Sequence, residues 1–366
     1  MSAALIDLVS VGAQDVYITG DPQVSFFRQN YKRHTNFSIK PERMDYIGTF
    51  ESGNEVSIPI KSKGDLLSYV WIENANINSR DNDASIFKSA NARSDETSPT
   101  EFSLWIGGQE VTKLDTLFIN TVHNTLYNES SAKATCAMTT QDGGDNAPTG
   151  SYIIPFFFSE DWTKSLPLVG LQYHEVEIRI KFRNGTFSLG SSPKVYGSYV
   201  FVDTDEREFF AKGEHEILIT QTQHQPMSAS DTSIDLTYFN HPVKAVHIAA
   251  GSNVSTSYTF TDASMFINGV PLFENMTHEY HRNVVPSRHC SVLNNTVDSE
   301  QIYTWPFCLT MNKSQPTGTL NFSRIDNAKI NINTPASAYL DMIRTYAVNY
   351  NILRIKNGMG GIAFGN

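Results

Sequence analysis

The sequence predicts an all-β protein that contains two similar units in tandem, each an antiparallel sandwich or barrel. The first observation is that each half holds about seven or eight short apolar runs bounded by turn residues, with few helical patterns. The second is the composition, because aromatic residues make up 11% of the chain and charged residues only 18%, which favours strands. The third is the length of 366 residues, which exceeds what one hydrophobic core usually fills.

An internal repeat gives the strongest support for two units. Four stretches of the first half have counterparts in the same order in the second half, so duplication explains them better than coincidence. In the last pair, the triplet Arg179-Ile180-Lys181 recurs as Arg354-Ile355-Lys356, which predicts that a similar strand closes each unit. The four pairs are Leu66–Ile72 with Val243–Ala250, Phe102–Val111 with Ala263–Leu272, Tyr152–Phe158 with Tyr303–Thr310, and His174–Phe182 with Asn349–Asn357.

Alternation of apolar residues and turn chemistry predict the remaining elements of the first half. Gly107-Gly108 predicts a hairpin turn, as Asn268-Gly269 does in the second half. Asp115–Leu126 has the spacing of a short helix. Further strands are predicted at Val16–Ile18, in the core of Phe26–Ile39, at Val56–Ile60 and at Tyr199–Val202. Long polar loops are predicted at Asn74–Thr100, Asn128–Gly150 and Asn184–Ser198, where the ends of a sandwich would gather them.

The charged stretch Asp203–Lys212 is predicted to be a short helix that joins the two units. Asp203 or Thr204 can cap it, and its early carboxylates suit the positive end of the helix dipole. Strands at Glu216–Thr222 and from Leu320 to Arg324 follow in the second half. The predicted divisions are an N-terminal amphipathic segment at 1–15, a first sandwich at 16–203, a connector at 204–212 and a second sandwich at 213–366.

The first residues form a short amphipathic segment. Ala4, Leu5, Leu8 and Val9 would share one face of a helix of two or three turns. This face either docks on the segment's own domain or contacts a neighbouring molecule or an underlying layer. Leu5, Leu8 and Val9 are therefore the candidate assembly residues.

Charge and cysteine content exclude several classes of function. The net charge of −10 argues against a direct nucleic-acid partner, because phosphate binding needs clustered Lys and Arg. The three cysteines, Cys136, Cys290 and Cys308, form no CxxC pair, so neither a disulfide framework nor a zinc site is expected. No stretch approaches the roughly 18 consecutive apolar residues of a membrane-spanning helix.

The sequence predicts no active site, metal site or cofactor. His278 and His281 lie three residues apart, but a metal needs three or four ligands, so a hydrogen-bonded pair at a strand end is expected. Ser287 to Cys290 places nucleophile and base types side by side, yet neighbours on a strand would point to opposite faces. No GxSxG, P-loop or GxGxxG motif is present. A pair of carboxylates from the scattered Asp and Glu residues is the remaining catalytic alternative.

Several stretches together resemble the major capsid proteins of nucleocytoplasmic large DNA viruses. The resemblance runs in order from residue 12 to the C-terminus. The stretches are Gly12–Phe37, Leu166–Phe182, Asp203–Glu208, Phe239–Lys244, Gln315–Ala328 and Tyr346–Gly361.

This resemblance implies a double jelly roll, in which two eight-stranded antiparallel sandwiches lie side by side with short helices in their loops. It implies a late structural protein that forms a homotrimer, a pseudo-hexagonal capsomer, and then an icosahedral shell of the virion. It also implies neighbouring capsomers, minor or cement proteins as partners, an inner lipid membrane nearby and assembly in the host cell cytoplasm.

Four other functions remain open from the sequence. The chain could be a minor capsid paralogue or an assembly scaffold of the same fold, and the compact loops of this short chain fit either. A carbohydrate-binding β-sandwich would expose aromatic residues in its loops, whereas Asn74–Thr100 has only Phe87. A hydrolase would need converging titratable groups, which the pattern does not contain.

Overall fold

The computed structural model describes residues 10–73, 99–130, 133, 138–139, 151–184, 193–250, 258–291, 301–336 and 343–365. The contacts divide the chain into two units, Met1–Asn36 and Phe37–Asn366. Most of the three predicted long loops lies outside the described residues.

The described part of the first unit, residues 10–36, contains one short helix where a strand was predicted. Residues Val16–Thr19 form α2, closed by hydrogen bonds from the backbone N–H of Thr19 to Asp15 and of Gly20 to Val16. The run of three apolar residues has no neighbouring strand among the described residues, so local backbone bonds determine its conformation. The strand prediction for Phe26–Ile39 is also mostly wrong, because β1 begins only at Phe37.

Residues 37–202 form two antiparallel sheets. One has the order β1-β10-β3-β7-β6, with β8 paired to β3, and the other has the order β2-β9-β4-β5. The strands are β1 Phe37–Met44, β2 Glu55–Ile60, β3 Leu66–Glu73, β4 Glu101–Ile106, β5 Gln109–Asp115, β6 Met138–Thr139, β7 Ser151–Ile154, β8 Leu166–Pro167, β9 Val176–Lys181 and β10 Lys194–Val202.

Residues 215–362 form two further antiparallel sheets. One has the order β11-β19-β13-β16, with β17 paired to β13 and β20 paired to β19, and the other has the order β12-β18-β14-β15. The strands are β11 His215–Met227, β12 Ser233–Asp235, β13 Pro242–Ala250, β14 Asp262–Ile267, β15 Val270–Thr277, β16 Gln301–Pro306, β17 Leu320–Asn321, β18 Ala328–Asn333, β19 Ile343–Lys356 and β20 Met359–Ile362.

The two halves repeat one strand order. The order β1-β10-β3-β7 corresponds to β11-β19-β13-β16, and β2-β9-β4-β5 corresponds to β12-β18-β14-β15. This arrangement confirms the all-β class and three of the four repeat pairs. Both predicted hairpins are present, with positive φ at Gly107, Gly108, Asn268 and Gly269.

The fourth repeat pair is wrong. The first Arg-Ile-Lys triplet lies in β9 and the second in β19, but the counterpart of β9 is β18 and the counterpart of β19 is β10. Alternation of apolar and charged residues is common to any strand with one buried face, so a matching triplet does not identify equivalent strands. The glycines after β19 do not end the chain's sheet either, because Asn357 and Gly358 form a turn into β20.

Helices are short and lie between strands. The predicted helix at Asp115–Leu126 is present as the π-helix η1, and the predicted strand Tyr152–Phe158 gives way after Ile154 to the helical turn α4. The Asp203 carboxylate accepts a hydrogen bond from the backbone N–H of Thr204, as expected for a cap of α5. The helices are η1 Phe118–Tyr127, α4 Phe157–Glu160, η2 Trp162–Lys164, η3 Leu168–Gly170, α5 Thr204–Lys212, η4 Tyr280–Val284, α6 Val285–His289 and η5 Phe322–Arg324.

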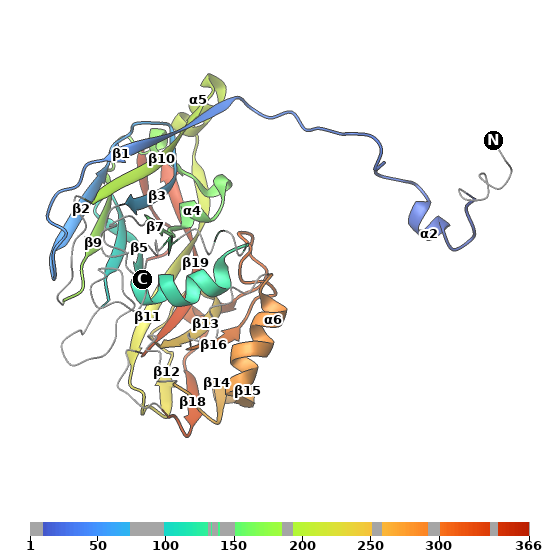
Figure 1. Cartoon of the computed structure of the whole chain (residues 1–366), viewed down its shortest axis with the longest axis vertical. Coiled ribbons are helices and arrows are strands. Elements are labelled where there is room, and N and C mark those ends of the chain that lie inside the picture. The colour runs from blue at the N-terminus through green and yellow to red at the C-terminus, as the bar shows by residue number, and fades with distance from the viewer. Residues whose placement is uncertain are drawn as a thin grey trace, which may run out of the picture. The chain divides into compact units, whose positions relative to one another are not determined.

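Two main hydrophobic cores fill the second unit. One core belongs to the second half, around Trp305, Tyr303 and Ile330. The other contains most buried side chains of the first half and also residues of β11 and β19, including Ile219, Val348 and Leu353. One continuous apolar core therefore joins the two halves, and β11 and β19 lie between the other strands of each (Figure 1). The domain boundaries at 203–213 and the count of eight strands in each sandwich stay predictions.

Candidate functional site

Among the described residues, buried charges and hydrogen bonds gather at the interface between the two halves. It is formed where β5, η1 and α4 of the first half meet β11, β13 and β19 of the second half. We call this interface the seam. The strand β19 makes the seam possible because both of its faces are buried. One face packs in the second sandwich and the other packs on the first.

A buried ion pair lies at the centre of the seam. Asp115 ends β5, and its carboxylate contacts the guanidinium of Arg344 at 2.7 Å. The Tyr346 hydroxyl donates to the same carboxylate, 2.8 and 2.9 Å from its two oxygens. The backbone N–H of Phe118 also donates to Asp115, at 2.6 Å. Burial, together with the neighbouring carboxylate, raises the pKa of Tyr346 well above its ordinary value, so the hydroxyl keeps its proton.

Three further contacts, each to a backbone carbonyl, link the two halves. The Gln221 amide donates to the carbonyl of Val111 at 2.5 Å. The backbone N–H of Tyr173 donates to the carbonyl of Gly358 at 2.9 Å, and a His174 ring nitrogen lies 2.8 Å from the carbonyl of Gly360. These bonds fix the register of the two sandwiches, because backbone groups cannot shift without breaking several bonds at once.

A second group of buried charges lies beside η1 and α4. Lys164 pairs with Glu160 at 2.7 Å, and the Thr220 hydroxyl of the second half donates to the same carboxylate. Burial acts to raise the pKa of Glu160, but Lys164 and Lys244 outweigh it and the pKa is lowered. Glu160 is therefore charged at neutral pH, and it binds partners from both halves.

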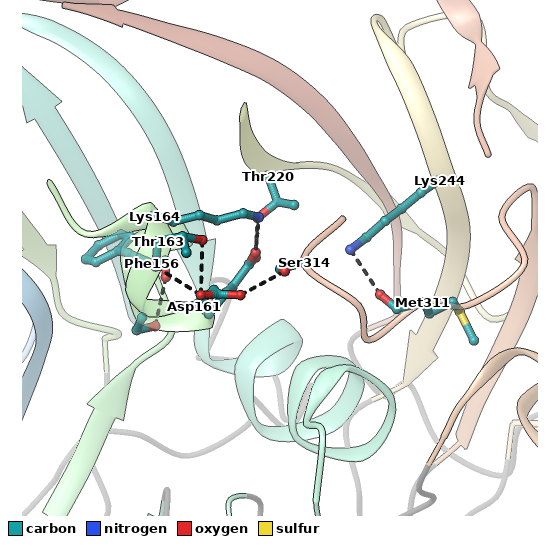
Figure 2. Close-up of polar contacts among 10 residues, drawn as sticks. Phe156, Asp161, Thr163, Lys164, Thr220, Lys244, Met311 and Ser314 are labelled. Atoms are coloured by element: carbon teal, nitrogen blue, oxygen red, sulfur yellow. Dashed lines mark hydrogen bonds and ion pairs between the residues drawn. The ribbon is translucent and has the colours of Figure 1, made fainter. Parts of the chain in front are cut away.

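Lys244 interrupts the apolar strand β13 and faces this group of charges. Its ammonium donates to the carbonyl of Met311 at 3.1 Å and lies 4.6 Å from the ring centroid of Tyr127. Burial lowers its pKa. Figure 2 shows Lys244 and Met311 on one side, opposite Asp161, which accepts a hydrogen bond from Ser314 at 2.9 Å.

A cavity of about 100 Å³ lies between these charges. It is lined by residues of η1, α4 and β13 and by the segment Met311–Ser314. Several ionic groups at its wall pair with protein partners, as Lys133 does with Glu129 and Glu160 does with Lys164. The described residues contain no group of His, Cys, Asp and Glu that could hold a metal ion.

The histidines near the seam are structural. His247 lies 2.7 Å from the hydroxyl of Tyr127 and 2.9 Å from that of Thr304. Burial lowers the pKa of His247 to about 3 and that of His123 to about 4. His281, whose pKa burial lowers to about 4, binds the carbonyl of Thr304 and stacks on Trp305. These rings are therefore neutral at pH 7.

The sequence-based candidates have other roles than chemistry. His278 and His281 do not form the expected hydrogen-bonded pair at a strand end, because η4 begins there and both rings pack on Phe260. Ser287 and His289 lie in the helix α6, not on a strand, and bind the carbonyls of Val284 and Cys308. Leu5, Leu8 and Val9 lie outside the described residues.

Comparisons with known proteins agree over the whole chain. A family model described as "Major capsid protein N-terminus" matches residues 25–203, and one described as "Large eukaryotic DNA virus major capsid protein" matches residues 247–361. The chain is 33% identical to the major capsid protein of Pyramimonas orientalis virus, over the full length of both proteins. The chain belongs to the major capsid proteins of large eukaryotic DNA viruses.

Further relatives support this membership. The capsid protein is 28% identical, over the full length of both chains, to the major capsid protein of Paramecium bursaria Chlorella virus 1. Its structure is similar to a chain of the PBCV-1 virus capsid, with a TM-score of 0.74 and 24% identity over 93% of this chain and 100% of that one. It is also similar to the Faustovirus major capsid protein, with a TM-score of 0.65 and 10% identity over 95% of each. These structures confirm the double jelly-roll fold.

The family settles the class of function. The capsid protein is a structural component of the virion capsid, and the prediction that it is not an enzyme is confirmed by the family. Among the described residues, no helix has the length and apolar character needed to cross a membrane. The seam is therefore a structural site, which fixes two jelly rolls in one block.

Sequence reasoning missed the residues of the seam. Asp115 and Arg344 are 229 positions apart, and nothing local marks them as partners. Lys244 and His247 did carry a signal in the sequence, because they interrupt an apolar strand. An ionisable group in a buried strand needs a polar partner from a neighbouring element. That signal predicts a polar contact on one face of β13 but does not identify η1 as its source.

Removal of Asp115 should destabilise the capsid protein strongly. In Asp115→Ala, Arg344 stays buried without its partner, so we expect the free energy of unfolding to fall by about 3–5 kcal/mol. The matched control is Glu216→Ala, which removes an ion pair with Arg354 whose side chains are more than half exposed, and should cost below about 1 kcal/mol. Urea denaturation followed by tryptophan fluorescence measures both. Equal losses in the two variants would mean that the buried pair does not hold the seam.

Stability should fall in mild acid because of the buried histidines. Their folded pKa values, about 3 to 4, lie below the unfolded value of about 6.5, so unfolding takes up protons as the pH falls from 6.5 towards 4. His247→Gln should reduce the slope of unfolding free energy against pH by up to about 1.4 kcal/mol per pH unit in this range. Denaturation at a series of pH values tests it, with the exposed His34→Gln as the control. An unchanged slope in His247→Gln would contradict the buried, neutral state of this ring.

Proposed function

We propose that three copies of the capsid protein form a capsomer with a six-fold outline, and that these capsomers tile an icosahedral shell. The observation that supports this most directly is that one strand order occurs twice in a single block held by the seam. Three chains of two similar jelly rolls give six similar lobes. Such a block can meet six neighbours in a flat lattice while using only three-fold symmetry.

The seam gives this proposal its physical basis. A tile must keep its shape when neighbours press on it, and two jelly rolls on a flexible linker would not. The ion pair of Asp115 with Arg344 and the continuous apolar core hold the two lobes in one register. The other proposed partners are neighbouring capsomers, minor or cement proteins and an inner membrane close to the shell, with assembly in the host cell cytoplasm.

The proposed trimer should be visible in solution. Light scattering of the purified protein at micromolar concentration should give three times the chain mass of 40.9 kDa, since stable capsomers need an interface above roughly 2,000 Å² in total. Negative-stain images should show particles with a six-lobed outline. A protein that stays monomeric at this concentration would contradict the proposal.

We propose that the N-terminal segment acts between capsomers or against an underlying layer. The described residues 10–36 contain no buried side chain, although Tyr17, Phe26 and Phe27 lie among them. Apolar side chains without a core are typical of binding segments. Leu5, Leu8 and Val9 would provide the same kind of contact from an amphipathic helix.

Deletion of residues 1–11 should separate assembly from folding. The truncated protein should form trimers with an unchanged melting temperature, because the described residues of this segment, 10–36, are all exposed, but its assembly into larger particles should be impaired. Light scattering and electron microscopy of both proteins measure this. Failure of the truncated protein to fold would show that the segment belongs to a core, and the proposal for the segment would be wrong.

A further inference from the structure

The strand pairings align the two halves residue by residue. In the hairpins, Ile106 opposite Gln109 corresponds to Ile267 opposite Val270. At the far ends, Glu101 lies opposite Asp115 and Asp262 lies opposite Thr277, so Asp115 corresponds to Thr277. A local contact repeats as well, because the backbone N–H of Phe118 donates to Asp115 and that of Tyr280 donates to Thr277.

The other sheets align in the same way. The register shifts by one residue at Ser68 in the pairing of β3 with β10, and at Lys244 in the pairing of β13 with β19. With these two shifts superposed, Trp71 opposite Tyr196 corresponds to His247 opposite Tyr346. Two residues further along β10 and β19, Lys194 corresponds to Arg344. The first half thus has counterparts for the residues that the second half contributes to the seam.

The first half contributes β5 and η1 to the seam, and the equivalent surface of the second half is exposed. Val111 and Leu114 of β5 are 2% and 6% exposed. Gln221 of the second half binds the carbonyl of Val111, and Leu114 lines a small cavity together with Thr220 and Val348 of the second half. The counterparts of Val111 and Leu114 in β15 are Leu272 and Met276, which are 51% and 36% exposed. Val270 of the same strand is also exposed. We call β15 with η4 the donor face.

In the seam, β5 and η1 pack on β11, β13 and β19, and the equivalent surface of the first half is not covered by another jelly roll. Ala245, His247 and Tyr346 are fully buried in the seam. Their counterparts Tyr69, Trp71 and Tyr196 are half-buried and lie in a row, with ring centroids 5.5 and 5.4 Å apart. On the adjoining edge strand β1, Phe37 and Ile39 are exposed. We call the outer side of β1, β10 and β3 the acceptor face.

We propose that the donor face of one copy docks on the acceptor face of a second copy, as β5 and η1 dock on β11, β13 and β19 within the chain. This inference rests on the proposed trimer and adds the residues that make it. The occupant is a second copy because each uncovered face is the counterpart of one side of an interface that this chain already makes with itself. The two faces lie on different jelly rolls, so a contact between two copies leaves one donor face and one acceptor face free. A third copy can bind both of these faces, which closes a ring of six jelly rolls.

The seam specifies the contacts expected between copies. Phe118 lies 5.3 Å from Tyr346 between ring centroids, so Tyr280 should pack on Tyr196 of the next copy. Gln221 of β11 binds the carbonyl of Val111, so Leu272 should lie against β1. Thr277 should come close to the Tyr196 hydroxyl and the Lys194 ammonium, where the seam has the carboxylate of Asp115.

A charge on the donor face should prevent trimer formation without unfolding the chain. Leu272→Asp should shift the midpoint of trimer dissociation to at least a hundredfold higher concentration, measured by mass photometry and light scattering. The matched control is Tyr238→Asp, because Tyr238 is 75% exposed but lies on neither face, and it should leave the midpoint unchanged. Far-ultraviolet circular dichroism and the thermal melt verify that both variants are folded.

A second pair of variants tests the register of the contact. Thr277→Asp rebuilds the carboxylate of the seam opposite Lys194 and should slow trimer dissociation about tenfold, whereas Thr277→Lys should accelerate it by a similar factor. Equal effects of the two substitutions would contradict the docking. This pair also decides the question if Leu272→Asp does not fold.

The outcomes separate this inference from the proposed function. A wild-type protein that is monomeric contradicts the trimer itself and the docking with it. A trimeric wild type whose Leu272→Asp variant is also trimeric contradicts only the docking. If hydrogen exchange shows the acceptor face protected in a Leu272→Asp monomer, and deletion of residues 1–36 removes that protection, the face is covered by the chain's own N-terminal segment and the docking is wrong.

Discussion

The architecture depends on one buried contact, in which the carboxylate of Asp115 meets Arg344 and Tyr346 of the other jelly roll. Two charges removed from water are stable only with close geometry and further hydrogen bonds, and here Tyr346 and the backbone of Phe118 supply them to the carboxylate. A contact of this kind tolerates little displacement, since loss of either partner leaves a charge buried alone. It therefore adds specificity of orientation to the apolar core, which by itself is non-directional.

In the docking proposed above, the duplication turns this orientation into a property of the assembly. Within one chain, the first jelly roll presents β5 and η1 to the second, and the second presents β11, β13 and β19 to the first. Because the strand order is repeated, the second jelly roll also has a surface equivalent to β5 and η1. The first jelly roll likewise has a surface equivalent to β11, β13 and β19. The differences between equivalent residues then follow from their surroundings. Positions inside the seam hold Arg344 and Asp115, whereas the uncovered counterparts hold Lys194 and Thr277, which tolerate water before contact.

The sequence predicted the parts of the fold that depend on local chemistry. The two hairpins followed from glycine and asparagine at positions of positive φ, and α5 followed from the cap at Asp203. Equivalence of strands was harder, because the Arg-Ile-Lys triplets of β9 and β19 look alike but occupy different sheets. The short apolar run of α2 was misassigned for a related reason, since β propensity acts only where a neighbouring strand is present. The ion pair of the seam could not be predicted, because its partners meet only after both jelly rolls have formed.

If the seam makes the two jelly rolls one cooperative block, they should unfold together. Native-state hydrogen exchange at increasing urea concentration, read by mass spectrometry on peptides from β3 and β13, measures this. The slowest amides of both strands should open with the same free energy and the same dependence on urea, because neither jelly roll can unfold while the other keeps its half of the seam. If one strand opens at a clearly lower free energy while the other stays protected, the jelly rolls are independent domains and the seam does not unite them.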